Sequence, residues 1–138
     1  MTEDPRAELV RRGFAAYESG DSAALFELFD PEIEVYSPAD SGNPGRFHGY
    51  AGFAEWVDHW NEAWDEFRQE IRDVESIGDR HVVVQVHQTA RGRGSGVEVE
   101  QDAAYIYELR AERVVYLAFC PDPDRANAEA RAREAATA

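Results

Sequence analysis

The sequence predicts an α+β domain, in which an antiparallel meander of three long strands carries helices on one face. Residues 80–90 are rich in β-branched side chains and contain neither Gly nor Pro. Residues 97–109 alternate between apolar and polar side chains, and residues 114–119 form a third apolar run before Pro121. The connections between these runs are short, so we expect neighbouring strands to be antiparallel.

Two helices are expected before this meander. Apolar residues recur at helical spacing from Pro5 to Ser19, and Gly20 follows in the position that favours a left-handed C-cap. Asp21 or Ser22 then caps a second, shorter helix. The Asp30-Pro31 pair closes this second helix, because the residue before proline disfavours the helical conformation.

The central part of the chain is expected to contain a strand, a loop, a helix and another strand. Residues 32–36 alternate as a short strand, and residues 37–49 are rich in Pro and Gly, which predicts a loop at the rim of a pocket. A third helix is expected over residues 51–66, followed by an edge strand over residues 68–77. An Ala-, Arg- and Glu-rich tail over residues 124–138 predicts a final helix.

Composition excludes several classes of function. The chain has 138 residues, with 28 acids and 14 bases for a formal net charge of −14, which repels nucleic acids and anionic membranes. Every base is arginine, so Schiff-base chemistry and a P-loop lysine are excluded. No spacing typical of a metal site is present, and Cys120 has no partner for an internal disulfide. We expect a cytoplasmic protein without a cofactor.

The order of elements and several short motifs resemble a known family. These motifs are the Gly20-Asp21 junction, the strand after Asp30-Pro31, the Arg46-Phe47-His48-Gly49 segment before a helix, the turn over 92–99 and the strand over 105–109. Together they are similar to the SnoaL-like group of the nuclear transport factor 2 and ketosteroid isomerase superfamily, over residues 8–120.

The resemblance implies a single domain over residues 1–138, with its core over 8–120 and a tail helix over 121–138. It implies a cone-shaped curved antiparallel sheet, packed on three N-terminal helices and enclosing a pocket, as in the cystatin-like α+β barrel. It also implies a homodimer through the outer face of the sheet.

The catalytic residues of ketosteroid isomerases are not matched. Aligned on the Gly20-Asp21 junction, their tyrosine falls on Gly13, their base on Ser37 and their neutral aspartic acid near Ala103. That isomerisation mechanism is therefore not expected here, unless a nearby acid such as Asp40 or Asp102 has taken over.

SnoaL-type polyketide cyclases are matched more closely, by Gln85, His87 and Asp102. In those enzymes an aspartate acts as acid and base, and a Gln-x-His pair lies on the preceding strand. A carboxylate can deprotonate a carbon acid while His and Gln stabilise the enolate oxygen. Strict alternation, however, places Asp102 on the face opposite Tyr105 and Tyr107, so a polar outer face or a dimer interface is the alternative interpretation.

Aromatic side chains are the other candidates for the pocket. Trp56, Trp60 and Trp64 recur every fourth residue on the third helix, either as core or, for Trp56 above all, as a pocket wall. Tyr17 is either a buried tyrosine with a satisfied hydroxyl or a pocket contact. The expected ligand-binding residues are Tyr17, Tyr36, His48, Trp56, Trp60, Tyr105, Tyr107 and Phe119.

Three functions remain open at this point. The first is a cofactor-independent cyclase or isomerase that acts by general acid–base chemistry on a hydrophobic carbonyl or polycyclic substrate. The second is a non-catalytic protein that binds a small hydrophobic molecule. The third is a dimeric protein-interaction module that uses the outer sheet face, which Glu98, Glu100 and Glu108 disfavour.

Overall fold

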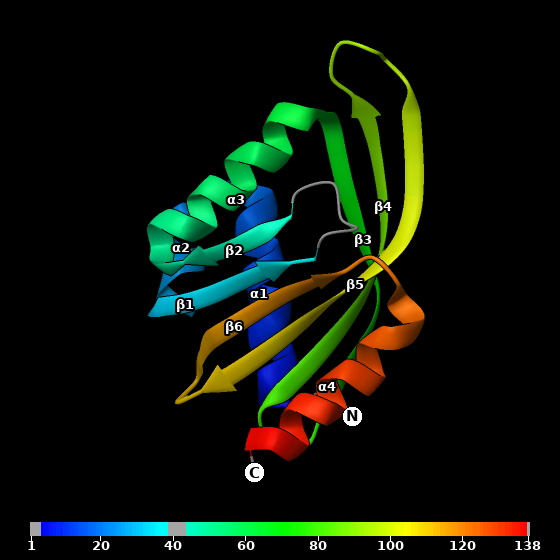
Figure 1. Cartoon of the computed structure of the whole chain (residues 1–138). Helices are drawn as coiled ribbons and strands as arrows, with labels where there is room; N and C mark the ends of the chain where they lie inside the picture. Colours follow the sequence, from blue (N-terminus) through cyan, green and yellow to red (C-terminus); the bar gives the residue numbers. More distant parts are fainter. Residues whose placement is uncertain (1–3, 39–43, 138) are drawn as a thin grey trace.

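A computed structural model describes residues 4–38 and 44–137, which form one curved, open sheet with helices on both of its faces (Figure 1). The helices and strands in chain order are α1 (Pro5–Ser19), α2 (Ser22–Glu27), β1 (Phe29–Ser37), β2 (Gly45–His48), α3 (Gly49–Ala63), β3 (Trp64–Ile77), β4 (His81–Gly92), β5 (Glu98–Arg110), β6 (Arg113–Cys120) and α4 (Pro123–Thr137). The predicted α+β class and the predicted meander β4–β5–β6 are confirmed.

The strand order is β2-β1-β6-β5-β4-β3. All neighbours are antiparallel except β1 and β6, which run parallel, with Val35 opposite Leu117. The sheet is therefore mixed, and the expectation of a wholly antiparallel sheet was wrong at this pair. The prediction of a loop over residues 37–49 was wrong in part, because residues 45–48 form β2. This strand pairs with β1, with Val35 opposite Phe47. The remainder of that loop, residues 39–43, lies outside the described residues.

Local signals set the helix ends. Asp4 caps α1, because its carboxylate accepts from the backbone N–H of Arg6 at 2.8 Å, and Gly20 ends the helix with a φ of 75°. The carboxylate of Asp21 caps α2 by accepting from the N–H of Ala24 at 3.1 Å. No helix in the described ranges is long and apolar enough to cross a membrane.

Several element boundaries differ from the sequence prediction, and α2 ends at Glu27, before the Asp30-Pro31 pair that was expected to close it and that lies within β1. β1 begins at Phe29, three residues before the predicted strand, and α3 ends at Ala63 rather than at residue 66. Glu66 has a φ of 55°, and the pairing of β3 with β4 shifts between Asp65 and Arg68. The chain therefore leaves the helix and enters β3 with Trp64, through a bulge that local helix propensity does not reveal.

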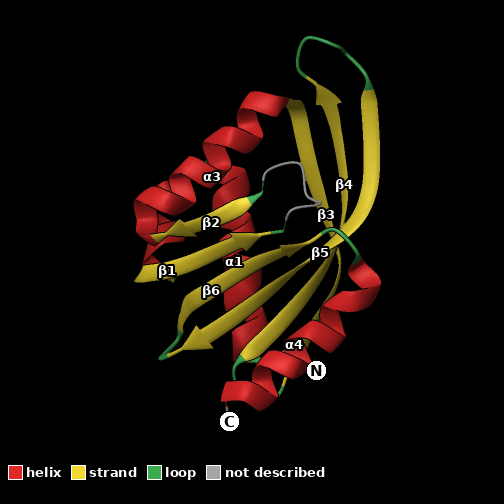
Figure 2. Ribbon diagram, in the orientation of Figure 1, coloured by secondary structure: helices red, strands yellow, loops and turns green. Residues whose placement is uncertain are grey.

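The sheet has a separate core on each face, and Figure 2 shows the helices that cover it. On the concave face, α1, α2 and α3 pack against residues such as Val84, Tyr105 and Leu117. On the convex face, α4 buries Ala126 and Ala130 against Val83 and Ile106. The outer face, through which the resemblance implies a dimer, is therefore covered in part by this chain's own C-terminal helix.

Candidate functional site

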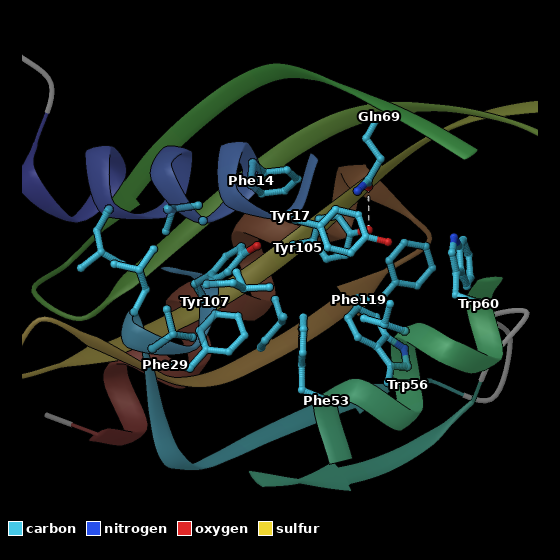
Figure 3. A pocket seen from close by; sticks show the side chains of 18 of the residues that line it. Phe14, Tyr17, Phe29, Phe53, Trp56, Trp60, Gln69, Tyr105, Tyr107 and Phe119 are labelled. Carbon is cyan, nitrogen blue, oxygen red and sulfur yellow. Dashed lines mark hydrogen bonds between the residues drawn. The ribbon is translucent and has the colours of Figure 1, made fainter. Parts of the chain in front are cut away.

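A cavity lies between the concave face of the sheet and helices α1, α2 and α3 (Figure 3). Its free volume is about 70 Å³, which is space for a few water molecules. The side chains around it are aromatic or aliphatic with few exceptions: Leu9, Val10, Gly13, Phe14, Tyr17, Leu25, Leu28, Phe29, Phe53, Trp56, Val57, Trp60, Phe67, Gln69, Tyr105, Tyr107, Val114, Leu117 and Phe119.

Tyr105 lies at the centre of an aromatic cluster that shapes the cavity wall. Its ring lies 5.8 Å from that of Phe14, 6.5 Å from that of Trp56 and 5.5 Å from that of Phe119, measured between centroids. The first two contacts are edge-to-face, the geometry that aromatic quadrupoles favour. Side chains from α1, α3, β5 and β6 thus hold one another in place around the empty space.

A chain of glutamines fixes the hydroxyl of Tyr105. This hydroxyl donates to Oε1 of Gln69 at 2.7 Å and accepts from Nε2 of Gln88 at 3.1 Å. Gln88 Nε2 also donates to Gln69 Oε1 at 2.9 Å, and Gln88 Oε1 accepts from Gln101 Nε2 at 2.8 Å. The network spans β3, β4 and β5, and Gln69 presents it to the cavity.

The three tyrosines of the cavity are held in the protonated form. Burial raises the pKa of Tyr17, and burial, together with the nearby Tyr17, raises the pKa of Tyr105 well above its ordinary value. Burial and the neighbouring Tyr105 likewise raise the pKa of Tyr107. At neutral pH these hydroxyls therefore act as hydrogen-bond donors or acceptors and not as bases.

The cavity lining has no formal charge at neutral pH. Among the described residues around it there is no Asp, Glu, His, Arg or Cys side chain. A proton-abstracting base is therefore absent from this part of the lining, and the arrangement favours desolvation and shape recognition over general acid–base chemistry.

The three residues predicted from the cyclase resemblance lie away from the cavity. His87 Nδ1 and Asp102 Oδ1 are 2.7 Å apart on the convex face, where the side chain of Asp102 is 70% exposed. Gln85 donates to the backbone carbonyl of Pro123, at the start of α4, at 3.2 Å. The β4–β5 register is uninterrupted with His87 opposite Asp102, so no bulge turns either side chain inward.

Six of the eight predicted ligand-binding residues do line the cavity: Tyr17, Trp56, Trp60, Tyr105, Tyr107 and Phe119. Tyr36 and His48 do not line it, and their predicted part in ligand binding stays a prediction. The ring of Tyr36 packs against the convex-face core. The guanidinium carbon of Arg46 lies over this ring, 4.6 Å from its centroid. His48 lies at the surface, with Nε2 at 2.7 Å from a carboxylate oxygen of Glu32.

Gln69 was not predicted, although the sequence contains a signal for it. Phe67, Gln69 and Ile71 alternate with exposed neighbours along β3, so Gln69 is a polar side chain on an otherwise apolar face. A polar residue in such a position usually has a buried hydrogen-bond partner. That partner, Tyr105, lies 36 residues further along the chain.

The described residues provide no cluster of three His, Cys, Asp or Glu side chains that could hold a metal ion. Cys120 is buried, and its thiol donates to the backbone carbonyl of Asp122 at 3.1 Å. Burial, together with the nearby Glu129, raises the pKa of this thiol to about 11, so it stays protonated and packs as an apolar side chain.

Comparisons with known proteins agree with this fold. A SnoaL-like domain profile matches residues 10–117. An uncharacterized protein of Mycobacterium tuberculosis (strain ATCC 25618 / H37Rv) is 30% identical over 125 residues, which cover 89% of this chain and 94% of that protein.

Two solved structures show the same fold at lower identity. A nuclear transport factor 2-like protein of unknown function from Burkholderia pseudomallei K96243 has a TM-score of 0.77 at 16% identity, covering 89% of this chain and 95% of that one. A putative polyketide cyclase from Pseudomonas putida KT2440 has a TM-score of 0.67 at 16% identity, covering 85% of this chain and 91% of that one. The predicted nuclear transport factor 2-like fold is confirmed.

Proposed function

The chain belongs to the family of SnoaL-like domains, and we propose that it binds a small, largely apolar molecule in the concave cavity without transforming it. The observation that carries this proposal is the lining: aromatic and aliphatic side chains surround one fixed polar group, the Gln69–Tyr105 pair. Such a site gains affinity from desolvation and takes orientation from few polar contacts.

The size of the cavity restricts the ligand. A free volume of about 70 Å³ leaves no room for fused rings unless side chains move, whereas a single ring or a short chain needs only small adjustments. Burying one phenyl ring, with roughly 150 Å² of apolar surface, contributes about 4 kcal/mol before the costs of association. We therefore expect dissociation constants of about 1 mM or weaker for simple one-ring probes.

Gly13 offers a direct way to close the cavity. It lines the cavity from α1, and a Cβ atom built there would lie 3.8 Å from methyl groups of Leu25 and Leu28, which is ordinary contact. A leucine at this position would extend into the free space. Ala15 is exposed on the same helix, so Ala15→Leu adds the same side chain outside the cavity.

The test is a titration with 4-phenylbutan-2-one, followed by tryptophan fluorescence, since Trp56 and Trp60 line the cavity. We expect binding by the wild type and by Ala15→Leu, and at least about tenfold weaker binding by Gly13→Leu, because filling the cavity excludes the ring. Circular dichroism melts of all three proteins control for folding. Equal affinity in Gly13→Leu and Ala15→Leu would show that the probe binds elsewhere.

A cyclase or isomerase is the second candidate. The observation that favours it is the buried, neutral hydroxyl of Tyr105, which can stabilise a developing enolate oxygen once its proton turns away from Gln69. Its test is exchange of the α-protons of the same ketone in deuterated water. If the wild type exchanges these protons faster than buffer does and Tyr105→Phe does not, catalysis is favoured. If the wild type exchanges them at the buffer rate, binding remains the proposed function.

A further inference from the structure

Tyr107 carries a hydroxyl group that the fold leaves without a hydrogen bond. The hydroxyl of Tyr105 makes two hydrogen bonds, whereas that of Tyr107 makes none with any described residue. Burial and the neighbouring Tyr105 raise the pKa of Tyr107, and no hydrogen bond lowers it. Because buried hydroxyl groups are paired as a rule, we expect the partner of this one to come from outside the chain.

The Tyr107 hydroxyl borders on free space. The unpaired polar atoms that the described residues enclose completely include Nε1 of Trp60 but not this hydroxyl. Tyr107 as a whole is only 8% exposed, and the free space that it lines is the cavity. A ligand in the cavity can therefore reach the hydroxyl of Tyr107, whereas neighbouring side chains close off the indole N–H of Trp60.

Tyr107 lies at the inner end of the cavity. A larger and more polar hollow adjoins the cavity and shares four residues with its lining: Tyr17, Leu25, Phe67 and Gln69. Tyr107 does not line this outer hollow. Figure 3 likewise shows Tyr107 and Gln69 on opposite sides of the cavity. A ligand atom that bonds to Tyr107 is therefore the most deeply placed part of that ligand.

The lining restricts the chemistry of this atom. The described residues around the cavity carry no formal charge, so an ionised group would lose its hydration without gaining a counter-charge. A hydrocarbon would enclose the Tyr107 hydroxyl and leave it unpaired, which is also unfavourable. A neutral oxygen avoids both costs, because it accepts a hydrogen bond from a neutral phenol.

We infer that the ligand is a small neutral molecule with an acceptor oxygen, and that this oxygen accepts a hydrogen bond from the Tyr107 hydroxyl at the inner end of the cavity. Tyr107 is thus the specificity-determining residue, and the ligand binds with its oxygen innermost. This inference rests on the proposed function, since it names the class of molecule that the same cavity takes and fixes its orientation.

The first test compares three one-ring probes of similar shape. These are acetophenone, α-methylstyrene, in which a CH2 group replaces the oxygen, and benzoate, which is ionised at neutral pH. Affinities are measured from the methyl NMR shifts of cavity residues in the wild type, in Tyr107→Phe and in Tyr116→Phe. Tyr116 packs against the convex-face core, so Tyr116→Phe removes the same group outside the cavity.

We expect Tyr107→Phe to bind acetophenone about fivefold more weakly than the wild type, which is the usual effect of losing one hydrogen bond. The same variant should bind α-methylstyrene no more weakly than the wild type, because no bond to the hydrocarbon is lost. Tyr116→Phe should match the wild type with each probe. Benzoate should bind to the wild type at least about tenfold more weakly than acetophenone.

A second measurement reports on the hydrogen bond itself. The NMR signal of a carbonyl carbon moves downfield when its oxygen accepts a hydrogen bond, so acetophenone labelled with carbon-13 at the carbonyl is titrated with each protein. We expect a downfield shift on binding to the wild type and to Tyr116→Phe, and none on binding to Tyr107→Phe. Melting temperatures close to that of the wild type would show that both substitutions leave the fold intact.

The outcomes separate this inference from the proposed function. If Tyr107→Phe changes the affinities for acetophenone and α-methylstyrene by the same factor, or if the carbonyl signal of bound acetophenone does not move in the wild type, Tyr107 does not bond the oxygen while cavity binding stands. Benzoate bound as tightly as acetophenone would overturn the choice of a neutral ligand. If no probe shifts the cavity methyl signals of any of the three proteins, the inference and the proposed function fall together.

Discussion

Replacing Glu134 by alanine should loosen the attachment of α4 to the convex face of the sheet. The carboxylate of Glu134 lies 2.7 Å from Nδ1 of His81 and accepts from the backbone N–H groups of Asp79 at 3.3 Å and Arg80 at 3.1 Å. One side chain of α4 therefore satisfies both the β3–β4 turn and a histidine that is completely buried.

The loss can be worked from these contacts. Nε2 of His81 makes no hydrogen bond within the described residues and lies 3.5 Å from a carboxylate oxygen of Glu108, so the substitution would leave the buried ring with this long contact alone, at a cost of about 1–3 kcal/mol. The two turn N–H groups can bond to water instead and add about 0.5 kcal/mol each. The total is about 2–4 kcal/mol. With an unfolding entropy of about 0.3 kcal/mol/K for 138 residues, the melting temperature should fall by about 10 °C.

The assay is thermal unfolding followed by circular dichroism at neutral pH, with Arg131→Ala as the control. Arg131 lies on the same helix, is 65% exposed and reaches Glu75 only at 4.0 Å, so its removal should shift the melting temperature by no more than about 2 °C. A Glu134→Ala protein that melts within 2 °C of the wild type, or no lower than Arg131→Ala, would refute the reasoning.

The same contacts predict a pH dependence. The hydrogen bond from His81 holds the pKa of Glu134 below its ordinary value of 4.5. Burial alone would raise the pKa of Glu108, but hydrogen bonds from Arg133 and Arg110 hold it below that value as well. A carboxylate with a lowered folded-state pKa stabilises the fold above the unfolded-state pKa, and this contribution disappears as the pH falls through the folded value. Glu134→Ala should therefore lose less stability than the wild type on acidification below about pH 4.5.

Three further predictions concern the two faces of the sheet. Tyr105→Phe should lower stability by about 1 kcal/mol, measured by urea unfolding, because Gln69 and Gln88 keep their mutual bond; a loss above about 3 kcal/mol would contradict this. Asp102→Asn should leave probe affinity unchanged, since this side chain lies on the convex face, and a fivefold change in calorimetry would place it in the site after all. Deleting residues 123–138 should uncover apolar residues such as Ile106, so the truncated protein should self-associate in sedimentation experiments. A truncated protein that stays monomeric would show that this face does not drive association.

Local signals explain which parts of the fold could be predicted. The limits of α1 follow from Asp4, Pro5 and Gly20, which act within one turn of the helix, and the long strands follow from alternation. β2 was missed because its four residues lie in a Pro- and Gly-rich segment and become a strand only by pairing with β1. The parallel pairing of β1 with β6 joins segments about eighty residues apart, which no local pattern reveals.

The site could be predicted where the alternation of side chains along a strand decides which face of the sheet a residue occupies. Tyr105 and Tyr107 share the concave face because strand side chains alternate, and the same alternation places Asp102 outside. The hydrogen bond between Gln69 and Tyr105 joins distant strands and could not be derived from spacing. The position of α4 could not be predicted either, because it packs through small residues, Ala126 and Ala130, which form only a weak apolar stripe.

The most direct test of the proposed function is a methyl NMR titration of the wild type with 4-phenylbutan-2-one. Val10, Leu25 and Leu117 report on the cavity, while Val83 and Ile106 report on the convex-face core beneath α4. Because a bound ring shifts the methyl signals that it touches, we expect saturable shifts at the three cavity residues and none beneath α4. Unchanged cavity signals at saturating probe, or shifts confined to Val83 and Ile106, would contradict the assignment of the concave cavity as the binding site.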